Sequence, residues 1–179
     1  GEIPGELAKG RIDLGVTGVD LVREKLADWE TEVQEVAPLG FGQADLIVAV
    51  PAAWIDVETL DDLDAAAAAF RLRHGHRLRI ATKYHRLVRD YLTGHGVADY
   101  ALVDSQGATE GTVKNGTAEA VADITSTGET LRANHLKVLQ NVGALPASVY
   151  DGRPVAQVAV DPLVARLARD AVLGAKFCY

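Results

Sequence analysis

Residues 120–134 read Ala120-Val-Ala-Asp-Ile-Thr-Ser-Thr-Gly-Glu-Thr-Leu-Arg-Ala-Asn134 and join an apolar run to a polar turn and a helical segment. The run Ala120 to Ile124 predicts a buried strand, and the helix is expected to begin near Glu129. In open α/β sheets, ligands bind where such strands end, at the carboxyl edge of the sheet. The stretch therefore predicts an α/β fold with a ligand site at the turn.

The alternation of short aliphatic runs with helix-length segments continues on the N-terminal side of this stretch. Four further strands are expected, at Ile12 to Thr17, Asp45 to Val50, Leu78 to Thr82 and Tyr100 to Asp104. Because helices separate most of these runs, the pattern predicts an α/β fold with mainly parallel strands.

Three helices are expected from their end signals. Thr59 to Arg73 has aspartates near its start, arginines near its end and Gly75 after it, which suits the helix dipole and a C-terminal cap. Tyr84 to Leu92 has apolar residues at helical spacing. A third helix, Leu163 to Leu173, follows Asp161-Pro162. Its apolar stripe packs either on the chain's own core or on a partner.

Composition excludes several classes of protein. Hydrophobic residues make up 48% of the chain, yet no apolar run approaches the roughly 20 residues that cross a bilayer. A net charge of −7 argues against broad nucleic-acid binding. The single cysteine, Cys178, rules out a disulfide framework. The start of the chain has no secretory hydrophobic segment, so we expect a cytoplasmic protein.

The turn after Ile124 has the composition of a phosphate-binding loop. The hydroxyls of Ser126, Thr127 and Thr130 surround the start of a helix, where backbone N–H groups lack partners. Gly128 allows the backbone to approach an anion, and Asp123 ends the strand. The alternative is an ordinary Ser/Thr helix cap. The spacing fits neither a Walker A loop nor a dinucleotide fingerprint.

Positive charge gathers between residues 71 and 89, which favours a polyanionic ligand. The segment holds seven of the chain's 18 basic residues: Arg71, Arg73, Arg77, Arg79, Lys83, Arg86 and Arg89. Most of these are expected to be solvated on helix faces. Lys83 differs because it directly follows a predicted strand end, where side chains point toward a ligand site.

Taken together, these segments resemble the short form of the catalytic chain of the ATP phosphoribosyltransferase family. The matching stretches are Asp13 to Asp20, Leu39 to Pro51, Arg79 to Tyr84, Gly107 to Glu110 and Asp123 to Leu131, with Asn134 and Leu136 after them. The likeness covers roughly residues 2 to 140, and the last stretch resembles the family's signature loop.

The resemblance implies a two-lobed, periplasmic-binding-protein-like (type II) α/β fold with the active site in the cleft between the lobes. Residues 1–50 and 140–179 would form lobe one, and residues 51–139 lobe two. The family's first lobe begins with a strand and a Lys-Gly-Arg turn that are not matched here. Because the sequence starts at Gly1 and contains no methionine, we expect that some tens of residues are absent and that restoring a leading strand raises activity strongly.

The resemblance also implies the reaction: N1 of ATP attacks C1′ of phosphoribosyl pyrophosphate and pyrophosphate leaves, which is the first step of histidine biosynthesis. The implied contacts with phosphoribosyl pyrophosphate are Asp123, Thr125, Ser126, Thr127, Gly128, Glu129 and Thr130. Asp123 and Glu110 are the implied catalytic residues. The implied nucleotide contacts are Lys83, Tyr84, Gly15 and Thr17.

The cofactor and partners implied by the resemblance follow from the same reaction. Mg²⁺ is expected, held largely by substrate oxygens with at most one or two carboxylates, so no metal cage made of protein is expected. The expected partners are ATP, phosphoribosyl pyrophosphate, further copies of the chain, and a regulatory subunit similar to histidyl-tRNA synthetase. Nucleic acid and membranes are not expected partners.

Two departures and two alternatives accompany the resemblance. Glu119 stands where the family usually has Asp, and His135 replaces a small residue. One alternative is a non-catalytic binding module of the same fold, because fold alone does not determine function. The other is a hydrolase with a Ser126, His135 and Asp123 triad, although the nucleophile motif Gly-x-Ser-x-Gly is absent.

Overall fold

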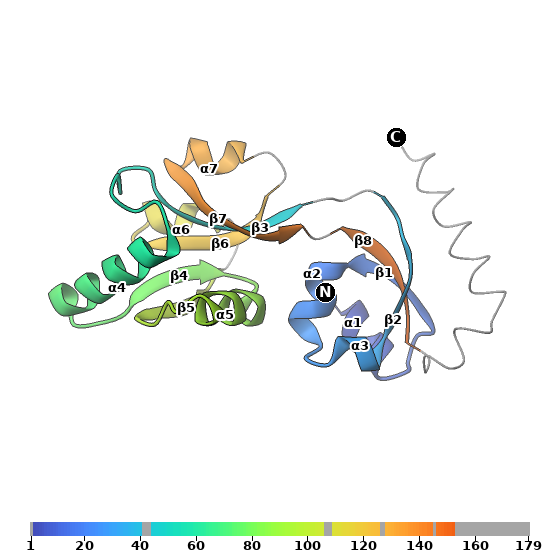
Figure 1. Cartoon of the computed structure of the whole chain (residues 1–179). Helices are drawn as coiled ribbons and strands as arrows, with labels where there is room; N and C mark the ends of the chain where they lie inside the picture. Colours follow the sequence, from blue (N-terminus) through green and yellow to red (C-terminus); the bar gives the residue numbers. More distant parts are fainter. Residues whose placement is uncertain (1, 41–43, 106–108, 126–127, 145, 153–179) are drawn as a thin grey trace. The chain divides into compact units, whose positions relative to one another are not determined.

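The computed structural model describes residues 2–40, 44–105, 109–125, 128–144 and 146–152 (Figure 1). Contacts within the chain divide it into two compact units. Residues Ala44–Ala144 form one of them, called here the central unit. The described residues before and after it form the other, called here the terminal unit.

The terminal unit is built on a small antiparallel sheet with the strand order β1-β8-β2. Its strands are β1 (Leu14–Gly18), β2 (Gln34–Pro38) and β8 (Ala147–Asp151), and its helices are α1 (Ile3–Ala8), α2 (Val19–Lys25) and α3 (Trp29–Glu32). Strand β8 lies between β1 and β2, so a segment that follows the central unit completes a sheet begun before it.

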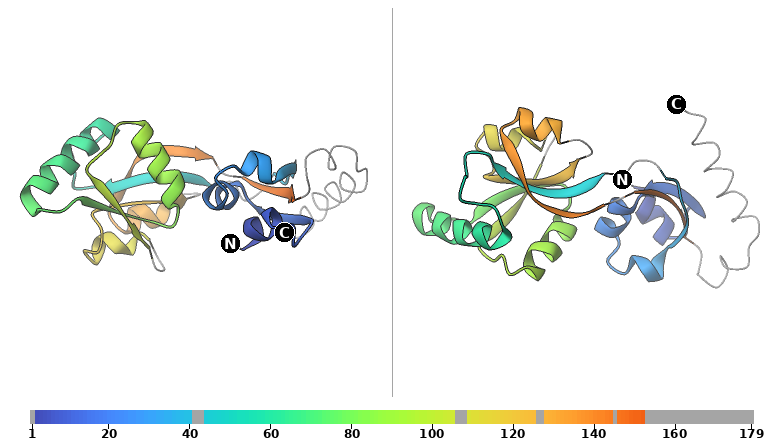
Figure 2. Two further views of the ribbon diagram at one scale, coloured as in Figure 1. Left: turned by 90° about the horizontal axis from the view of Figure 1, so that it is seen from below. Right: turned by 45° about the horizontal axis from the view of Figure 1, so that its top comes forward.

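The central unit contains a five-stranded sheet with the order β5-β4-β6-β3-β7 (Figure 2). Its strands are β3 (Asp45–Pro51), β4 (Leu78–Thr82), β5 (Tyr100–Asp104), β6 (Ala120–Thr125) and β7 (Leu136–Ala144). Strand β4 runs parallel to β5 and β6, while β3 runs antiparallel to β6 and β7. The helices are α4 (Leu60–His74), α5 (His85–Gly94), α6 (Gly111–Lys114) and α7 (Glu129–Ala133).

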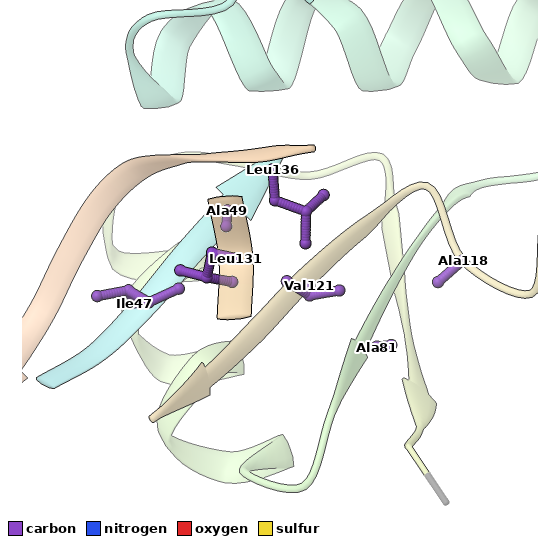
Figure 3. Packing of buried hydrophobic residues seen from close by; sticks show 7 residues of the cluster. All are labelled: Ile47, Ala49, Ala81, Ala118, Val121, Leu131 and Leu136. Carbon is purple, nitrogen blue, oxygen red and sulfur yellow. The ribbon is translucent and has the colours of Figure 1, made fainter. Parts of the chain in front are cut away.

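Consecutive residues Leu46 to Val50 of β3 are all buried, so both faces of this strand are covered. On one face, Leu131 of α7 packs into a cluster of buried residues that come mainly from the strands (Figure 3). Val113 of α6 packs against this cluster. The buried members of that cluster are Ile47, Ala49, Ala81, Ala118, Val121, Leu131 and Leu136. Alternation along each strand sends the neighbouring side chains to the opposite face.

Helix α4 begins and ends as its sequence predicts. Thr59 Oγ1 accepts a hydrogen bond from the Asp62 N–H at 3.2 Å, and Asp62 Oδ2 accepts one from the Thr59 N–H at 2.9 Å. This reciprocal capping box satisfies backbone donors that the first turn leaves unpaired. Gly75 ends the helix in the left-handed conformation, with φ of 75°.

All five expected strands are present, but the prediction of mainly parallel strands is wrong. Among the described residues, four of the six strand pairings are antiparallel. The helix α4 between β3 and β4 does not fix the relative direction of these two strands, because residues 52–59 form a long connection between β3 and the helix. The expected helix Leu163 to Leu173 lies outside the described residues.

The expected lobe boundaries differ from the division that the contacts give. The expected boundaries lie after residues 50 and 139, whereas the central unit extends from Ala44 to Ala144. The difference arises because β3 and β7 pair along their whole lengths, from Asp45 opposite Ala144 to Pro51 opposite Leu136. Both strands therefore belong to the central unit.

Candidate functional site

Three strands of the central unit end side by side. In the register of the sheet, Thr82 of β4 lies opposite both Asp104 of β5 and Ala122 of β6. The residues that follow these positions, among them Lys83 and Asp123, therefore share the carboxyl edge of the parallel part of the sheet. This is the edge at which α/β sheets bind ligands.

Asp123 lies near the end of β6 on the face of the sheet that α7 covers. It alternates with Val121, a member of the cluster beneath α7, so the two share a face. The carboxylate is partly buried, and its Oδ1 accepts a hydrogen bond from the Ile124 N–H at 2.8 Å. The acid is thus held beside the turn that leads into α7.

Gly128 occupies the position before α7 in the left-handed conformation, with φ of 68°. A Cβ there would meet only Arg132 Nη1, at 3.6 Å, so the glycine is required by backbone conformation more than by space. Its N–H donates to Thr125 Oγ1 at 3.0 Å, which closes the turn locally. Ser126 and Thr127 lie outside the described residues.

Helix α7 is short and is anchored by one side chain. Leu131 is buried in the core, while Glu129 and Thr130 in the first turn are exposed. The helix ends where the Asn134 side-chain amide donates to the Thr130 carbonyl at 2.9 Å. The predicted residues Asp123, Thr125, Gly128, Glu129 and Thr130 are therefore brought together on one strand–turn–helix unit.

A buried hydroxyl network at the same edge was missed by the sequence reasoning. Thr109 Oγ1 donates to Ser105 Oγ at 2.9 Å, and the Ser105 N–H donates to the Thr82 carbonyl at 3.2 Å. All three residues are buried. The network ties the segment after β5 to the end of β4 and so positions Glu110, the residue before α6. Small hydroxyl residues next to predicted strand ends were the signal for it.

The two predicted nucleotide contacts after β4 differ in accessibility. Lys83 is exposed at the carboxyl edge. The Tyr84 side chain is buried, and its N–H donates to Thr82 Oγ1 at 2.9 Å. Lys83 is therefore accessible to a ligand. Packing of the Tyr84 ring in the core is enough to explain an aromatic residue at position 84, and no ligand is needed to explain it.

Gly15 and Thr17 lie on β1, in the terminal unit. A Cβ at Gly15 would come within 2.6 Å of Ile3 Cγ2 and 3.2 Å of Leu7 Cδ1. Thr17, which shares the Gly15 face of the strand, is also buried. Gly15 thus lets α1 pack closely on the sheet, and packing explains both residues without a ligand.

Replacing Gly15 with valine is expected to destabilise the protein by about 1–3 kcal/mol, because the added carbons overlap α1. Urea unfolding followed by circular dichroism measures the change. Gly94→Val is the control, since a Cβ at Gly94 meets no atom within 4 Å. Equal stability of the two variants would contradict this packing role for Gly15.

Glu119 lies just before β6, at the opposite edge of the sheet, where it pairs with Arg79. Its Oε2 accepts from the Arg79 backbone N–H at 2.7 Å, and its Oε1 accepts from Arg79 Nη2. Burial acts to raise the pKa of the Glu119 carboxyl, but the hydrogen bonds and charge of Arg79 outweigh it and hold the pKa below its ordinary value of 4.5. The residue that departs from the family pattern thus has a structural role far from the turn.

Glu119→Gln is expected to lower the free energy of unfolding by about 1–3 kcal/mol at neutral pH, the range for hydrogen bonds to charged groups. The folded-state pKa is depressed, so the stabilisation is present above pH 4.5 and is lost as the pH falls through the lower folded value. Denaturant unfolding over a pH series should show the two proteins converging in acid. The exposed change Glu30→Gln serves as the control, and a difference that does not vary with pH would refute the assignment.

The hydrolase alternative fails on geometry. Asp123 lies opposite Ile47 of β3, and Leu136, the residue after His135, lies opposite Pro51. Ile47 and Pro51 are four residues apart on that strand, or about 13 Å. His135 lies just beyond the end of α7 with φ of 57°, and its carbonyl accepts from the Ala52 N–H at 2.8 Å, so the backbone turn after the helix accounts for the residue. Asp123 and His135 are therefore too far apart to orient one another.

The described ranges contain no group of three or more His, Cys, Asp or Glu side chains arranged to hold a metal ion. Among the helices in these ranges, none has the length and apolar character required to cross a bilayer.

Comparison with known proteins gives a consistent result. The family model for ATP phosphoribosyltransferase (HisG) matches residues 1–169. ATP phosphoribosyltransferase from Cereibacter sphaeroides is 80% identical over 141 residues, which are 79% of this chain and 60% of that protein. The enzyme from Mesorhizobium japonicum is 59% identical over 139 residues, which are 77% and 60% of the two chains. The chain spans about 60% of the length of these curated relatives.

Solved structures establish the fold. The HisG:HisZ complex of ATP phosphoribosyl transferase from Thermotoga maritima has a TM-score of 0.73 at 22% identity, covering 97% of this chain and 76% of that one. A histidine kinase sensor domain similar to periplasmic binding proteins has a TM-score of 0.58 at 14% identity, covering 98% and 69%. The expected periplasmic-binding-protein-like α/β fold is confirmed.

Proposed function

The chain belongs to the ATP phosphoribosyltransferase family, and we propose that it transfers the phosphoribosyl group of phosphoribosyl pyrophosphate to N1 of ATP with release of pyrophosphate. This reaction would be the first step of histidine biosynthesis. The observation that carries the proposal is the unit formed by β6, the turn and α7. This unit brings together the carboxylate of Asp123, near the end of β6, and Gly128, whose backbone is in the left-handed conformation. Both lie at the carboxyl edge of the parallel strands, where α/β sheets bind ligands.

In this proposal, residues 125–130 hold the 5-phosphate of phosphoribosyl pyrophosphate. Thr125 Oγ1 accepts from the Gly128 N–H, so its own O–H is left to donate to a phosphate oxygen. Thr130 adds an exposed hydroxyl in the first turn of α7. The predicted contacts Ser126, Thr127 and Glu129 complete the loop in the proposal.

The reaction makes its main demands on alignment and electrostatics. The bond from C1′ to pyrophosphate breaks as N1 of ATP bonds to C1′, and positive charge develops on the ribose ring. A carboxylate beside the ring stabilises that charge, and it also accepts hydrogen bonds from the ribose hydroxyls. Asp123 suits this role because its position is already fixed by the Ile124 N–H.

Glu110 is proposed as the second acid, and Mg²⁺ as the metal. Mg²⁺ prefers oxygen ligands and binds through one or two carboxylates plus substrate phosphates, a donor set that Asp123 and Glu110 fit. When bound, the ion would neutralise charge on the departing pyrophosphate. Glu110 is positioned by the hydroxyl network of Ser105 and Thr109.

Lys83 is proposed as the nucleotide contact, because its ammonium group is exposed at the same edge. We leave Tyr84, Gly15 and Thr17 out of the proposed contacts because packing accounts for all three. The Thermotoga maritima complex pairs HisG with HisZ. We propose a similar regulatory subunit for this chain, related to histidyl-tRNA synthetase, together with assembly into homo-oligomers in the cytoplasm.

Two measurements test the function. Calorimetric titration of the chain with phosphoribosyl pyrophosphate and Mg²⁺ should show binding. Addition of ATP should then release pyrophosphate, measured with a coupled assay on the 179-residue chain and on a version extended to the length of its relatives. Binding without pyrophosphate release in either form would favour a binding module, and no binding would refute the assignment of the turn.

A further inference from the structure

One pocket of the central unit lies away from the edge that carries Asp123. It has a volume of about 500 Å³ and is lined by α5, by residues 96–98 and by the first residues of β5, the outermost strand of the sheet (Figure 1). Its lining includes Arg77, the residue before β4, and Val97, which precedes β5. The pocket therefore lies at the amino end of these two parallel strands.

Two arginines line this pocket, and neither has an acidic partner. Arg77 and Arg89 are exposed, and in the part of the chain that the structure describes their guanidinium groups form no ion pair. By contrast, Arg79 of the same basic segment is paired with Glu119. The positive charge that gathers between residues 71 and 89 is thus partly used inside the fold and partly presented to this pocket.

Two hydroxyl groups add hydrogen-bonding capacity to the lining. Thr93 Oγ1 and Tyr100 Oη lie 3.3 Å apart, and the Tyr100 O–H donates to the Arg89 carbonyl at 3.4 Å. These contacts hold α5 against the start of β5. A hydroxyl can donate one hydrogen bond while it accepts others, so both groups suit an anionic ligand.

The acidic side chains next to the pocket are already paired. Asp99, which lies between two lining residues in the sequence, pairs with Arg71. Asp64 Oδ1 accepts a hydrogen bond from the Ala98 N–H at 2.8 Å. The two unpaired guanidinium groups therefore determine the charge of the pocket.

The end of α5 also lies here, and unpaired carbonyls at a helix end would repel an anion. These carbonyls are satisfied by the segment that follows the helix. The Leu92 carbonyl accepts from the Val97 N–H at 3.0 Å, and the Thr93 carbonyl accepts from the Gly96 N–H at 3.1 Å. Repulsion from the helix end is thereby reduced.

We propose that this pocket binds a small phosphate monoester. Two guanidinium groups balance the roughly two negative charges of such a group, and their N–H donors match the geometry of its oxygens. Val97 and Leu102 supply an apolar wall for the organic part of the ligand. The volume is that of an ordinary small-molecule pocket. The proposal does not depend on the transferase function, because it concerns the opposite edge of the sheet.

Calorimetric titration of the full chain with phenyl phosphate tests the proposal. Arg77→Gln and Arg89→Gln should each weaken binding by roughly tenfold or more, because each change removes a charge-assisted hydrogen bond. Arg73→Gln is the matched control, since Arg73 is also an exposed arginine but does not line this pocket. Gly128→Val, which alters the turn before α7, should bind the probe as the native chain does.

Two further probes identify the class of ligand. Inorganic phosphate should bind more weakly than phenyl phosphate because it leaves the apolar wall uncovered. Benzoate should also bind more weakly, because it carries a single negative charge. Absence of phenyl phosphate binding, or equal weakening by Arg73→Gln, would overturn the proposal. So would loss of binding in Gly128→Val, or either further probe binding as tightly as phenyl phosphate.

Discussion

Gly128→Val is expected to abolish measurable binding of phosphoribosyl pyrophosphate. Gly128 has φ of 68°, a conformation that a β-branched residue adopts only with strain, so the turn before α7 would be rebuilt. Rebuilding would displace the Thr125 hydroxyl and the amides around it. Loss of two charge-assisted hydrogen bonds, at about 1.5–3 kcal/mol each, weakens affinity more than a hundredfold.

A matched glycine separates this effect from general strain. Gly75, after α4, has φ of 75°, and a Cβ there meets no atom within 4 Å, so that backbone strain is its main cost, as it is at Gly128. Gly75→Val should therefore cost a similar amount of stability, about 1–2 kcal/mol, without loss of binding. Calorimetry and denaturant unfolding on both variants give the comparison. If Gly128→Val binds as well as Gly75→Val does, the turn is an ordinary helix cap.

Strands marked by a short apolar run could be predicted from the sequence, including the edge strand β5, and strands without such a run could not. β4 and β5 match the prediction residue for residue because short apolar runs bounded by polar residues mark them. β7 was missed because its sequence alternates apolar with polar residues and leaves Val138 49% exposed, so it has no continuous apolar run. β2, which pairs only with β8, was missed for the same reason.

The candidate site was predictable where local sequence determines local structure. A strand, a glycine and a helix start within a few residues placed Asp123 and Gly128 correctly on one unit. Residues whose surroundings come from distant parts of the chain were not predictable. Gly15 is explained by the side chains of α1, and Tyr84 by burial in the core, and neither environment can be read from neighbouring residues.

Asp123→Asn is expected to lower kcat by about a hundredfold while changing the free energy of unfolding little. The amide keeps the shape of the side chain and an oxygen that accepts from the Ile124 N–H, so the strand end is preserved. It lacks the negative charge that faces the developing positive charge on the ribose ring. Removal of one such electrostatic contact costs about 10²–10³ in rate.

The split between turnover and stability is what distinguishes this role from a structural one. Pyrophosphate release at saturating ATP and phosphoribosyl pyrophosphate reports kcat, and urea unfolding reports stability. Asp104→Asn is the control, because Asp104 ends β5 at the same edge, two strands from β6, and contacts His85 at 3.4 Å. Equal turnover in Asp123→Asn and the native chain would remove the carboxylate from the chemistry. A matching loss in Asp104→Asn would show that the whole edge, and no single acid, sets the rate.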